Sequence, residues 1–313
     1  MNIMSADQPL HRGPPLKFIH VGHHKCGSTF LQYEVLPKIH ALRQPSGKQP
    51  DGTSDLRFRR AWISLASQGD GGFDIEAVAR EFSRKDFNCL SNEAFSGYGS
   101  IAAATGSHAP LAAQRLHRIF GDVPVLIVIR NQRSIVQSLY MDDVEYGYVA
   151  DFEAWARHRH FHNMLDWFRY APLIEAYQTA FGQQRVHVIT AEDLYRRETI
   201  EAVLQRFDIP SDGLDAVDFG RRVNDSPCGP VVWLTRQLFR RIGTPANMGR
   251  GMVYNFWIDH ARWTLDRLLR QAGAARAEYN FLGYEDILRE TFHADNLRVT
   301  ALTGLDLTVH NYP

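Results

Sequence analysis

The chain has 313 residues, of which 44% are hydrophobic, so it is long enough to bury one large core. Its 35 basic residues balance its 35 acidic residues, and overall charge therefore gives no support to a nucleic-acid-binding or membrane-surface role. The three scattered cysteines cannot form a disulfide framework and indicate a reducing compartment, and no apolar run approaches the roughly 18 residues of a membrane span.

Short apolar segments alternate with helical patterns along the chain. Strands are predicted at 17–21, 87–90, 123–129 and 186–189, with helices between them, for example at 75–84 and 111–120. This alternation favours an α/β fold of the P-loop-like, three-layer type, in which helices flank a central parallel sheet. Residues 1–15 are polar and lack a signal-peptide core. We expect them to form a flexible segment that precedes a single domain at 16–313.

The first strand runs into a glycine-bounded loop. Gly22 and Gly27 have the spacing of the Walker A motif, whose backbone N–H groups and following helix bind phosphate. The position where a nucleotide triphosphatase carries lysine holds Ser28, and the cation of the loop is Lys25. The loop is therefore predicted to bind an anion, with Lys25 approaching it from a different side.

The strand predicted at 123–129 ends in Arg130. A Walker B strand would end in an aspartate that organises Mg²⁺, whereas a cation at this place suits a second anion. Ser138 follows eight residues later, in a segment that reads as the start of a helix. An ordinary surface ion pair is the alternative interpretation of Arg130.

Together these two motifs resemble the sulfotransferases that use 3′-phosphoadenosine 5′-phosphosulfate (PAPS) as donor. In that family a K-x-G-[ST]-[ST] loop binds the 5′-phosphosulfate, and an arginine at a strand end with a serine eight residues later binds the 3′-phosphate. The residues that the resemblance implies for donor binding are Lys25, Cys26, Gly27, Ser28, Thr29, Arg130 and Ser138. Weaker matches to the family lie at 186–194, a strand followed by an acidic turn, and at the Asn-x-Ser segment 224–226.

Sulfuryl transfer needs a base for the acceptor and a cation for the leaving oxygen. Lys25 suits the second role. Glu93, which follows the strand predicted at 87–90, resembles the base of carbohydrate-type family members. A plain helix N-terminal carboxylate is the alternative for Glu93, and His23 or His24 could serve as base instead. Cys26 is predicted to be a small loop residue rather than a nucleophile.

Two further patterns have mainly structural interpretations. His158 and His162 share a helical face with Asp166 if one helix spans them, a spacing that a metal could use, but sulfuryl transfer needs no metal. The aromatic helical pattern at 254–269 is interpreted as core, although one ring could stack on adenine. The glycine-rich segments 45–55 and 243–251 are predicted to be loops, and a late loop of this kind closes over the nucleotide in the resembled family.

The sequence thus predicts a PAPS-dependent sulfotransferase with Lys25 and Glu93 as catalytic residues and no metal. It is expected to be a cytoplasmic, bacterial-type member of the carbohydrate branch, acting on a hydroxyl or amine of a glycan or other polar small molecule. Neither a nucleic-acid partner nor a membrane span is expected. The alternatives are a P-loop small-molecule kinase, which would require Mg²⁺, and a non-catalytic protein that binds PAPS or its product 3′-phosphoadenosine 5′-phosphate (PAP).

Overall fold

The computed structural model describes residues 8–45, 55–66, 73–96, 108–158, 161–220, 226–245 and 251–313. Four features predicted from the sequence therefore lie outside the described residues or at their edge. They are the loop at 45–55, the middle of the loop at 243–251, Asn224 and His160. Within the described part of the chain, no helix is both long enough and apolar enough to cross a membrane.

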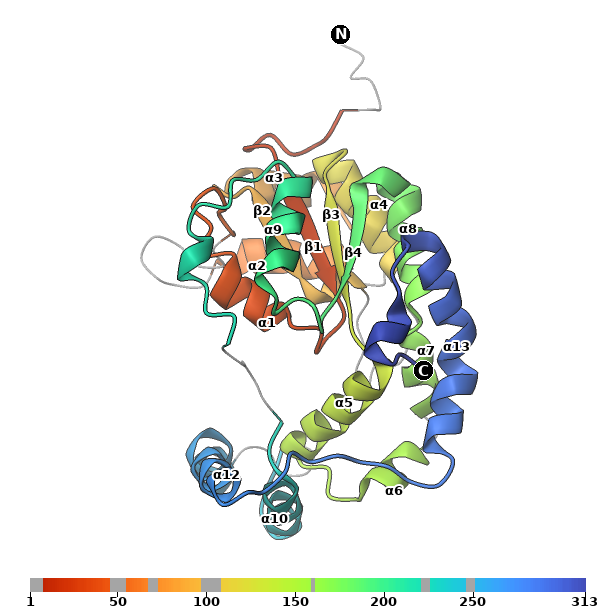
Figure 1. Cartoon of the computed structure of the whole chain (residues 1–313). Helices are drawn as coiled ribbons and strands as arrows, with labels where there is room; N and C mark the ends of the chain where they lie inside the picture. The colour runs from red at the N-terminus through yellow and green to blue at the C-terminus, as the bar shows by residue number, and fades with distance from the viewer. Residues whose placement is uncertain are drawn as a thin grey trace.

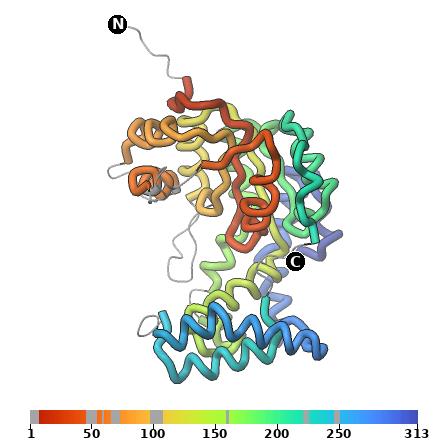
Figure 2. The backbone as a smooth tube through the Cα atoms, turned by 90° about the vertical axis from the view of Figure 1, so that its left-hand side faces the viewer, coloured from red at the N-terminus to blue at the C-terminus, as the bar shows by residue number. Residues whose placement is uncertain are grey.

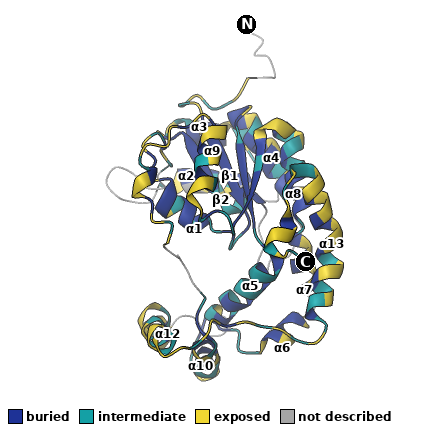
Figure 3. Ribbon diagram, viewed as in Figure 1, coloured by how far each residue is buried: buried dark blue, intermediate teal, exposed yellow. Residues whose placement is uncertain are grey.

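Four parallel strands form the central sheet, in the order β2-β1-β3-β4. Their bounds are β1 Phe18–Gly22, β2 Cys89–Asn92, β3 Val125–Ile129 and β4 Val186–Thr190. Every residue of β1 and β3 is buried, as expected for inner strands that have both faces covered. Figure 3 shows these strands in the dark blue of buried residues, in the upper part of the molecule. The four predicted strands are confirmed, with bounds that differ by one or two residues.

Helices cover both faces of the sheet (Figure 1). The α-helices are α1 Ser28–Phe30, α2 Leu56–Ala66, α3 Ile75–Ser83, α4 Ala109–Phe120, α5 Gln132–Tyr146, α6 Phe152–Ala156, α7 Phe161–Trp167, α8 Tyr170–Phe181, α9 Arg197–Arg206, α10 Gly229–Phe239, α11 Met252–Phe256, α12 Arg262–Gln271 and α13 Tyr284–Thr303. Helix α8 packs against α4, β3 and β4, and α13 covers the outside of α8. The α/β class predicted from the sequence, with helices flanking a parallel sheet, is confirmed.

Helix α5 leads from the sheet to a smaller helical layer (Figures 1 and 2). This layer contains α10 and a continuous helical rod in which a π-helical turn, Trp257–Ala261, joins α11 to α12. Helix α5 begins where the Asn131 side chain accepts a hydrogen bond from the Arg133 N–H, and it ends at Gly147, whose φ is 114°. Helix α5 therefore connects the sheet to the helical layer, and its side chains line the space between them.

The described part of the predicted flexible segment, residues 8–15, has fixed contacts. Leu10 and His11 donate backbone hydrogen bonds to Arg118 and Ile119 at the end of α4. The His11 ring also packs against Phe87 and Phe120. These bonds and ring contacts place residues 8–15 against the sheet domain, while the flexibility expected for the segment stays a prediction.

One turn gives a stability prediction. Gly213 has a φ of 95°, and a Cβ atom there would lie 1.8 Å from the Lys38 backbone oxygen, whereas Gly273 has a φ of 93° with nothing within 4 Å. Left-handed backbone costs a residue with a Cβ about 1–2 kcal/mol, and a clash adds about 1–3 kcal/mol. We expect Gly213→Ala to lower the free energy of unfolding in urea by about 2–5 kcal/mol and the control Gly273→Ala by only about 1–2 kcal/mol. Equal losses in the two variants would contradict the close packing of Gly213.

Candidate active site

The candidate site lies at the carboxyl ends of the strands, beside the central strand β1. Parallel sheets bind ligands at such a place, where connections leave a strand toward opposite sides. The loop between β1 and α1 turns sharply there, with Lys25 at φ 70° and Gly27 at φ 83°. A Cβ atom on Gly27 would lie 2.7 Å from Leu194 Cδ2. Glycine at this position therefore satisfies both the backbone conformation and the close packing.

A cavity of about 200 Å³ opens above this loop; we call it the donor cavity, after the donor that the sequence predicts for this loop. It is lined by His24, Lys25, Gly27, Ser28, Thr29, Phe30, Glu93, Arg130, Ser138, Asp142 and Tyr195. The fold thus brings the ends of β1, β2 and β3 and one face of α5 to a single space. Every residue predicted for the site, Cys26 excepted, lines it.

Cys26 lies elsewhere. Its side chain is fully buried, and its backbone N–H donates to the His23 oxygen at 3.2 Å within the turn. Burial raises the pKa of the thiol, which stays protonated. The expectation that Cys26 is no nucleophile agrees with this environment. Its inclusion among the donor-binding residues stays a prediction, and the structure directs the side chain into the core and pairs the N–H with His23.

Arg130 links the two predicted motifs. Its Nη1 atom donates a hydrogen bond to the Lys25 backbone oxygen at 2.6 Å. The buried Tyr170 hydroxyl donates to the Arg130 oxygen at 2.5 Å and accepts from its N–H at 3.3 Å. The next residue, Asn131, donates its N–H to Glu192. The end of β3 is therefore fixed, with the guanidinium held beside the loop and Ser138 two helical turns further along α5.

Lys25 has a partner that the sequence analysis missed. Its Nζ atom lies 2.6 Å from Asp142 Oδ1, and both side chains are about one-third exposed, at 29% and 34%. Burial raises the pKa of Asp142 above its ordinary value, although Lys25 partly opposes this effect. Asp142 stands four residues after Ser138 and so on the same helix face. That spacing was a signal available in the sequence.

His24 and Glu93 form a second pair in the donor cavity. His24 Nδ1 lies 2.6 Å from Glu93 Oε2. Burial raises the pKa of Glu93, but the hydrogen bond and charge of His24, with smaller effects of Ser28 and His20, outweigh it, so that the pKa lies below its ordinary value. Glu93 is therefore a carboxylate at neutral pH, held against an imidazole that also faces the cavity.

His23 is unsuited to act as base. Its ring is buried against Trp167, Phe168 and Tyr170, and neither ring nitrogen has a hydrogen-bond partner among the described residues. Burial, with a smaller effect of the neighbouring His24, lowers its pKa to about 3. His23 is thus a neutral packing residue, and of the two loop histidines only His24 lines the cavity.

The buried His23 gives a pH prediction. Its folded-state pKa lies below the unfolded value, so the unfolded chain binds an extra proton between pH 6.5 and about 3, and stability falls as the pH falls through this window. We expect His23→Phe to weaken that fall by roughly 1.4 kcal/mol per pH unit below pH 6.5. Urea unfolding at several pH values between 7.5 and 4.5 measures the two slopes. Parallel curves for the variant and the wild type would show that His23 is not buried neutral.

The histidine-rich segment does not form the single helix that a metal site would use. His158 lies in the turn after α6, and His162 belongs to α7, so the predicted shared face with Asp166 is wrong for His158. The chain leaves the helical conformation at Arg157 and His158, and the Phe161 N–H, at the start of α7, donates to the His158 oxygen.

The aromatic residues that line the cavity differ from those that the sequence pattern at 254–269 offered for stacking on adenine. Phe30 and Tyr195 line the donor cavity, with ring centroids 4.5 Å apart. Tyr195 directly follows the predicted acidic turn, which was the signal available for it. Within the predicted aromatic helix, Tyr254 is buried as expected, whereas Phe256 is 62% exposed.

Comparisons with known proteins give low similarity. No protein-family model matches the chain, and no curated protein matches it. Among solved structures, a sulfotransferase from Alicyclobacillus acidocaldarius is 19% identical, with 67% of this chain and 87% of that chain covered and a TM-score of 0.47. The sulfotransferase domain of the Synechococcus PCC 7002 olefin synthase is 12% identical (87% and 97% covered, TM-score 0.40), and a mouse sulfotransferase complexed with PAP is 10% identical (93% and 92% covered, TM-score 0.37). At these values the comparisons say nothing of substrate or mechanism, which depend on the side chains of the cavity.

Proposed function

We propose that the chain is a PAPS-dependent sulfotransferase that transfers the sulfuryl group to a hydroxyl or amine of a carbohydrate or other polar small molecule. The observation that carries this proposal is the meeting of the Lys25 loop and Arg130 at one cavity, with Ser138 beside them. A donor with two separate anionic groups needs two such sites. The cation at the end of β3 favours a second phosphate over the metal that a P-loop kinase would hold there.

The residues of the donor cavity fit the two ends of this donor. The backbone of the loop, with Ser28 and Thr29, would hold the phosphosulfate, and Arg130 with Ser138 would hold the 3′-phosphate. Tyr195, which is partly exposed and backed by the fully buried Phe30, offers the ring surface near which an adenine would lie. Lys25 would leave Asp142 to donate a hydrogen bond to the oxygen on which charge develops as the sulfur–oxygen bond breaks.

The Glu93–His24 pair would act as the general base. It lines the same cavity as Lys25, so the base would take the proton of the acceptor on one side of the sulfur while Lys25 contacts the leaving oxygen on the other side. This is the arrangement that an in-line displacement requires. Glu93 thus keeps the role expected from the sequence, with His24 as its partner, and His23 has none.

Conversion of PAPS to PAP by the purified chain tests the proposal. We expect conversion to depend on an added acceptor, in a panel of monosaccharides, oligosaccharides and hydroxylated amines, and to continue in EDTA. Consumption of ATP that stops in EDTA would support a kinase instead. PAP binding without any conversion across the panel would support the non-catalytic alternative.

A further inference from the structure

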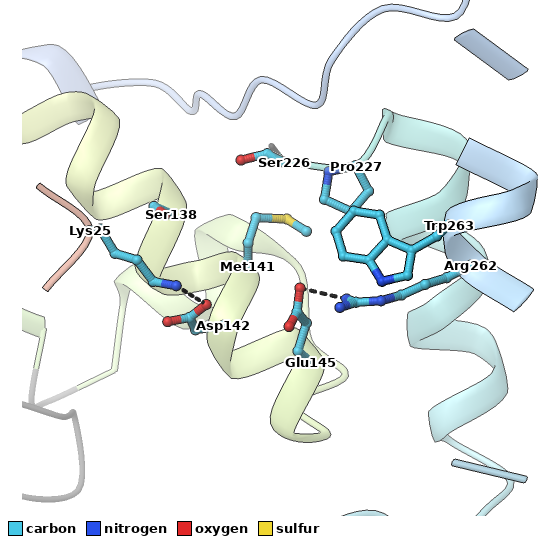
Figure 4. Close-up of a pocket in the computed structure, with 9 residues that line it drawn as sticks. All are labelled: Lys25, Ser138, Met141, Asp142, Glu145, Ser226, Pro227, Arg262 and Trp263. Carbon is cyan, nitrogen blue, oxygen red and sulfur yellow. Dashed lines mark ion pairs between the residues drawn. The ribbon is translucent and has the colours of Figure 1, made fainter. Parts of the chain in front are cut away.

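A second cavity, of about 170 Å³, adjoins the donor cavity (Figure 4). Its lining consists of Lys25, Ser138, Met141, Asp142, Glu145, Ser226, Pro227, Arg262 and Trp263. It shares Lys25, Ser138 and Asp142 with the donor cavity. In Figure 4 the residues of α5 form one wall, and Arg262 and Trp263 of α12 face them. A molecule in this second cavity therefore lies next to Lys25, at the point where the two cavities meet.

Arg262 and Glu145, at the far end of the second cavity, form an ion pair with each other. Arg262 Nη1 lies 2.5 Å from Glu145 Oε1, and the arginine side chain is only 7% exposed. Its Nε atom donates to the Ile258 oxygen at 2.9 Å, and its guanidinium lies 4.4 Å from the centre of the Trp263 ring. Arg262 therefore holds α12 against α5, and it is not available to pair with an anionic group of a ligand.

Asp142, at the junction of the cavities, differs from Arg262 because its partner is a residue that the proposed function assigns to the donor. Lys25 is its ion-pair partner, at 2.6 Å, and Glu145 lies one helical turn away with a like charge. If Lys25 turns to the donor, Asp142 remains as a carboxylate that is 34% exposed and has lost its counterion. Such a partly buried carboxylate is stabilised when another positive charge or strong hydrogen-bond donor takes the vacated place.

Building on the proposed function, we propose that the second cavity binds the acceptor, and that this acceptor carries an amine whose ammonium group replaces Lys25 as the partner of Asp142. Met141, Pro227 and Trp263 supply apolar surface for the carbon skeleton of such a molecule. The reacting group of the acceptor extends toward Glu93 and His24. Donor and acceptor binding are then coupled, because a bound donor draws Lys25 away and leaves Asp142 to the amine, and the coupling is reciprocal.

Calorimetric titration of matched amine and neutral compounds tests this inference. The pairs are glucosamine and glucose, galactosamine and galactose, and tyramine and 4-hydroxyphenethyl alcohol, each titrated with and without saturating PAP. We expect at least one amine to bind about tenfold more tightly than its neutral partner, and to bind several-fold more tightly with PAP than without it, as expected for a charged hydrogen bond.

Asp142→Asn should reduce the preference for the amine to within about threefold, while PAP binding stays at least as tight as in the wild type. The control is Glu153→Gln, which removes one negative charge from an exposed pair with Arg157 on α6 and should keep the preference. Binding of PAP without any preference for an amine, or a preference that survives in Asp142→Asn, would overturn this inference alone. Failure to bind PAP would overturn the proposed function and this inference with it.

Discussion

Glu93→Gln is expected to lower kcat by about 10²–10⁴-fold, the usual contribution of a general base, while the affinity for PAP stays within a few-fold of the wild type. Glutamine keeps the size of the side chain and can still bond His24, but it cannot hold the proton that the acceptor loses. The Glu93 carboxylate faces the cavity from the end of β2 and is held 2.6 Å from His24, and glutamine keeps an oxygen that can maintain this contact with the phosphate-binding loop.

The measurement for Glu93 is steady-state turnover with radiolabelled PAPS, paired with PAP titration of the same preparation. Glu285→Gln is a suitable control, because that carboxylate pairs with Arg133 and lies outside the donor cavity. Turnover of Glu93→Gln within about tenfold of the wild type would remove Glu93 from the mechanism. His24 would then be the next candidate, since it lines the cavity and His23 does not.

Lys25→Ala and Arg130→Ala are each expected to weaken PAP binding by about 1.5–3 kcal/mol, or roughly 10- to 150-fold, the range for hydrogen bonds to charged groups. The two variants should differ in turnover. Lys25→Ala should also lower kcat by about 10²–10³-fold, because Lys25 alone is assigned to the leaving oxygen. Arg130→Ala should act mainly on binding, since its assigned contact, the 3′-phosphate, does not change during the reaction.

Arg133→Ala is the matched control for Arg130. It removes an arginine three residues further along the chain, whose partner is Glu285 and which does not line the donor cavity. Calorimetry should show unchanged PAP affinity for this variant. Unchanged affinity in both Lys25→Ala and Arg130→Ala would contradict the assignment of two anion sites.

The sequence predicted the fold well because its signals are local. Continuous apolar runs mark β1 and β3, which are buried on both faces, and the alternation with helices defines the parallel sheet. The carboxyl ends of parallel strands meet at one edge, so the approach of Lys25, Glu93 and Arg130 also followed from strand positions alone.

The missing parts of the site depend on tertiary contacts that no local pattern contains. The pairing of His24 with Glu93 arises from the register of β1 against β2, and the burial of Cys26 arises from the turn at Lys25 and Gly27. Arg262 reaches Glu145 of α5 only because α12 packs near α5, and the helical pattern at 254–269 gave no indication of that contact. Asp142 is the exception, because its place on the helix face of Ser138 could have been predicted from the spacing.

Calorimetric titration with PAP, compared with ADP and with ATP in the presence of Mg²⁺, tests whether the two anion sites bind a 3′,5′-bisphosphate without a metal. We expect tight binding of PAP that does not change when EDTA is added, and weak binding of the other two nucleotides. A preference for ATP with Mg²⁺ would contradict the proposed function, because it would mean that Arg130 and the Lys25 loop do not bind the two anionic ends of PAPS.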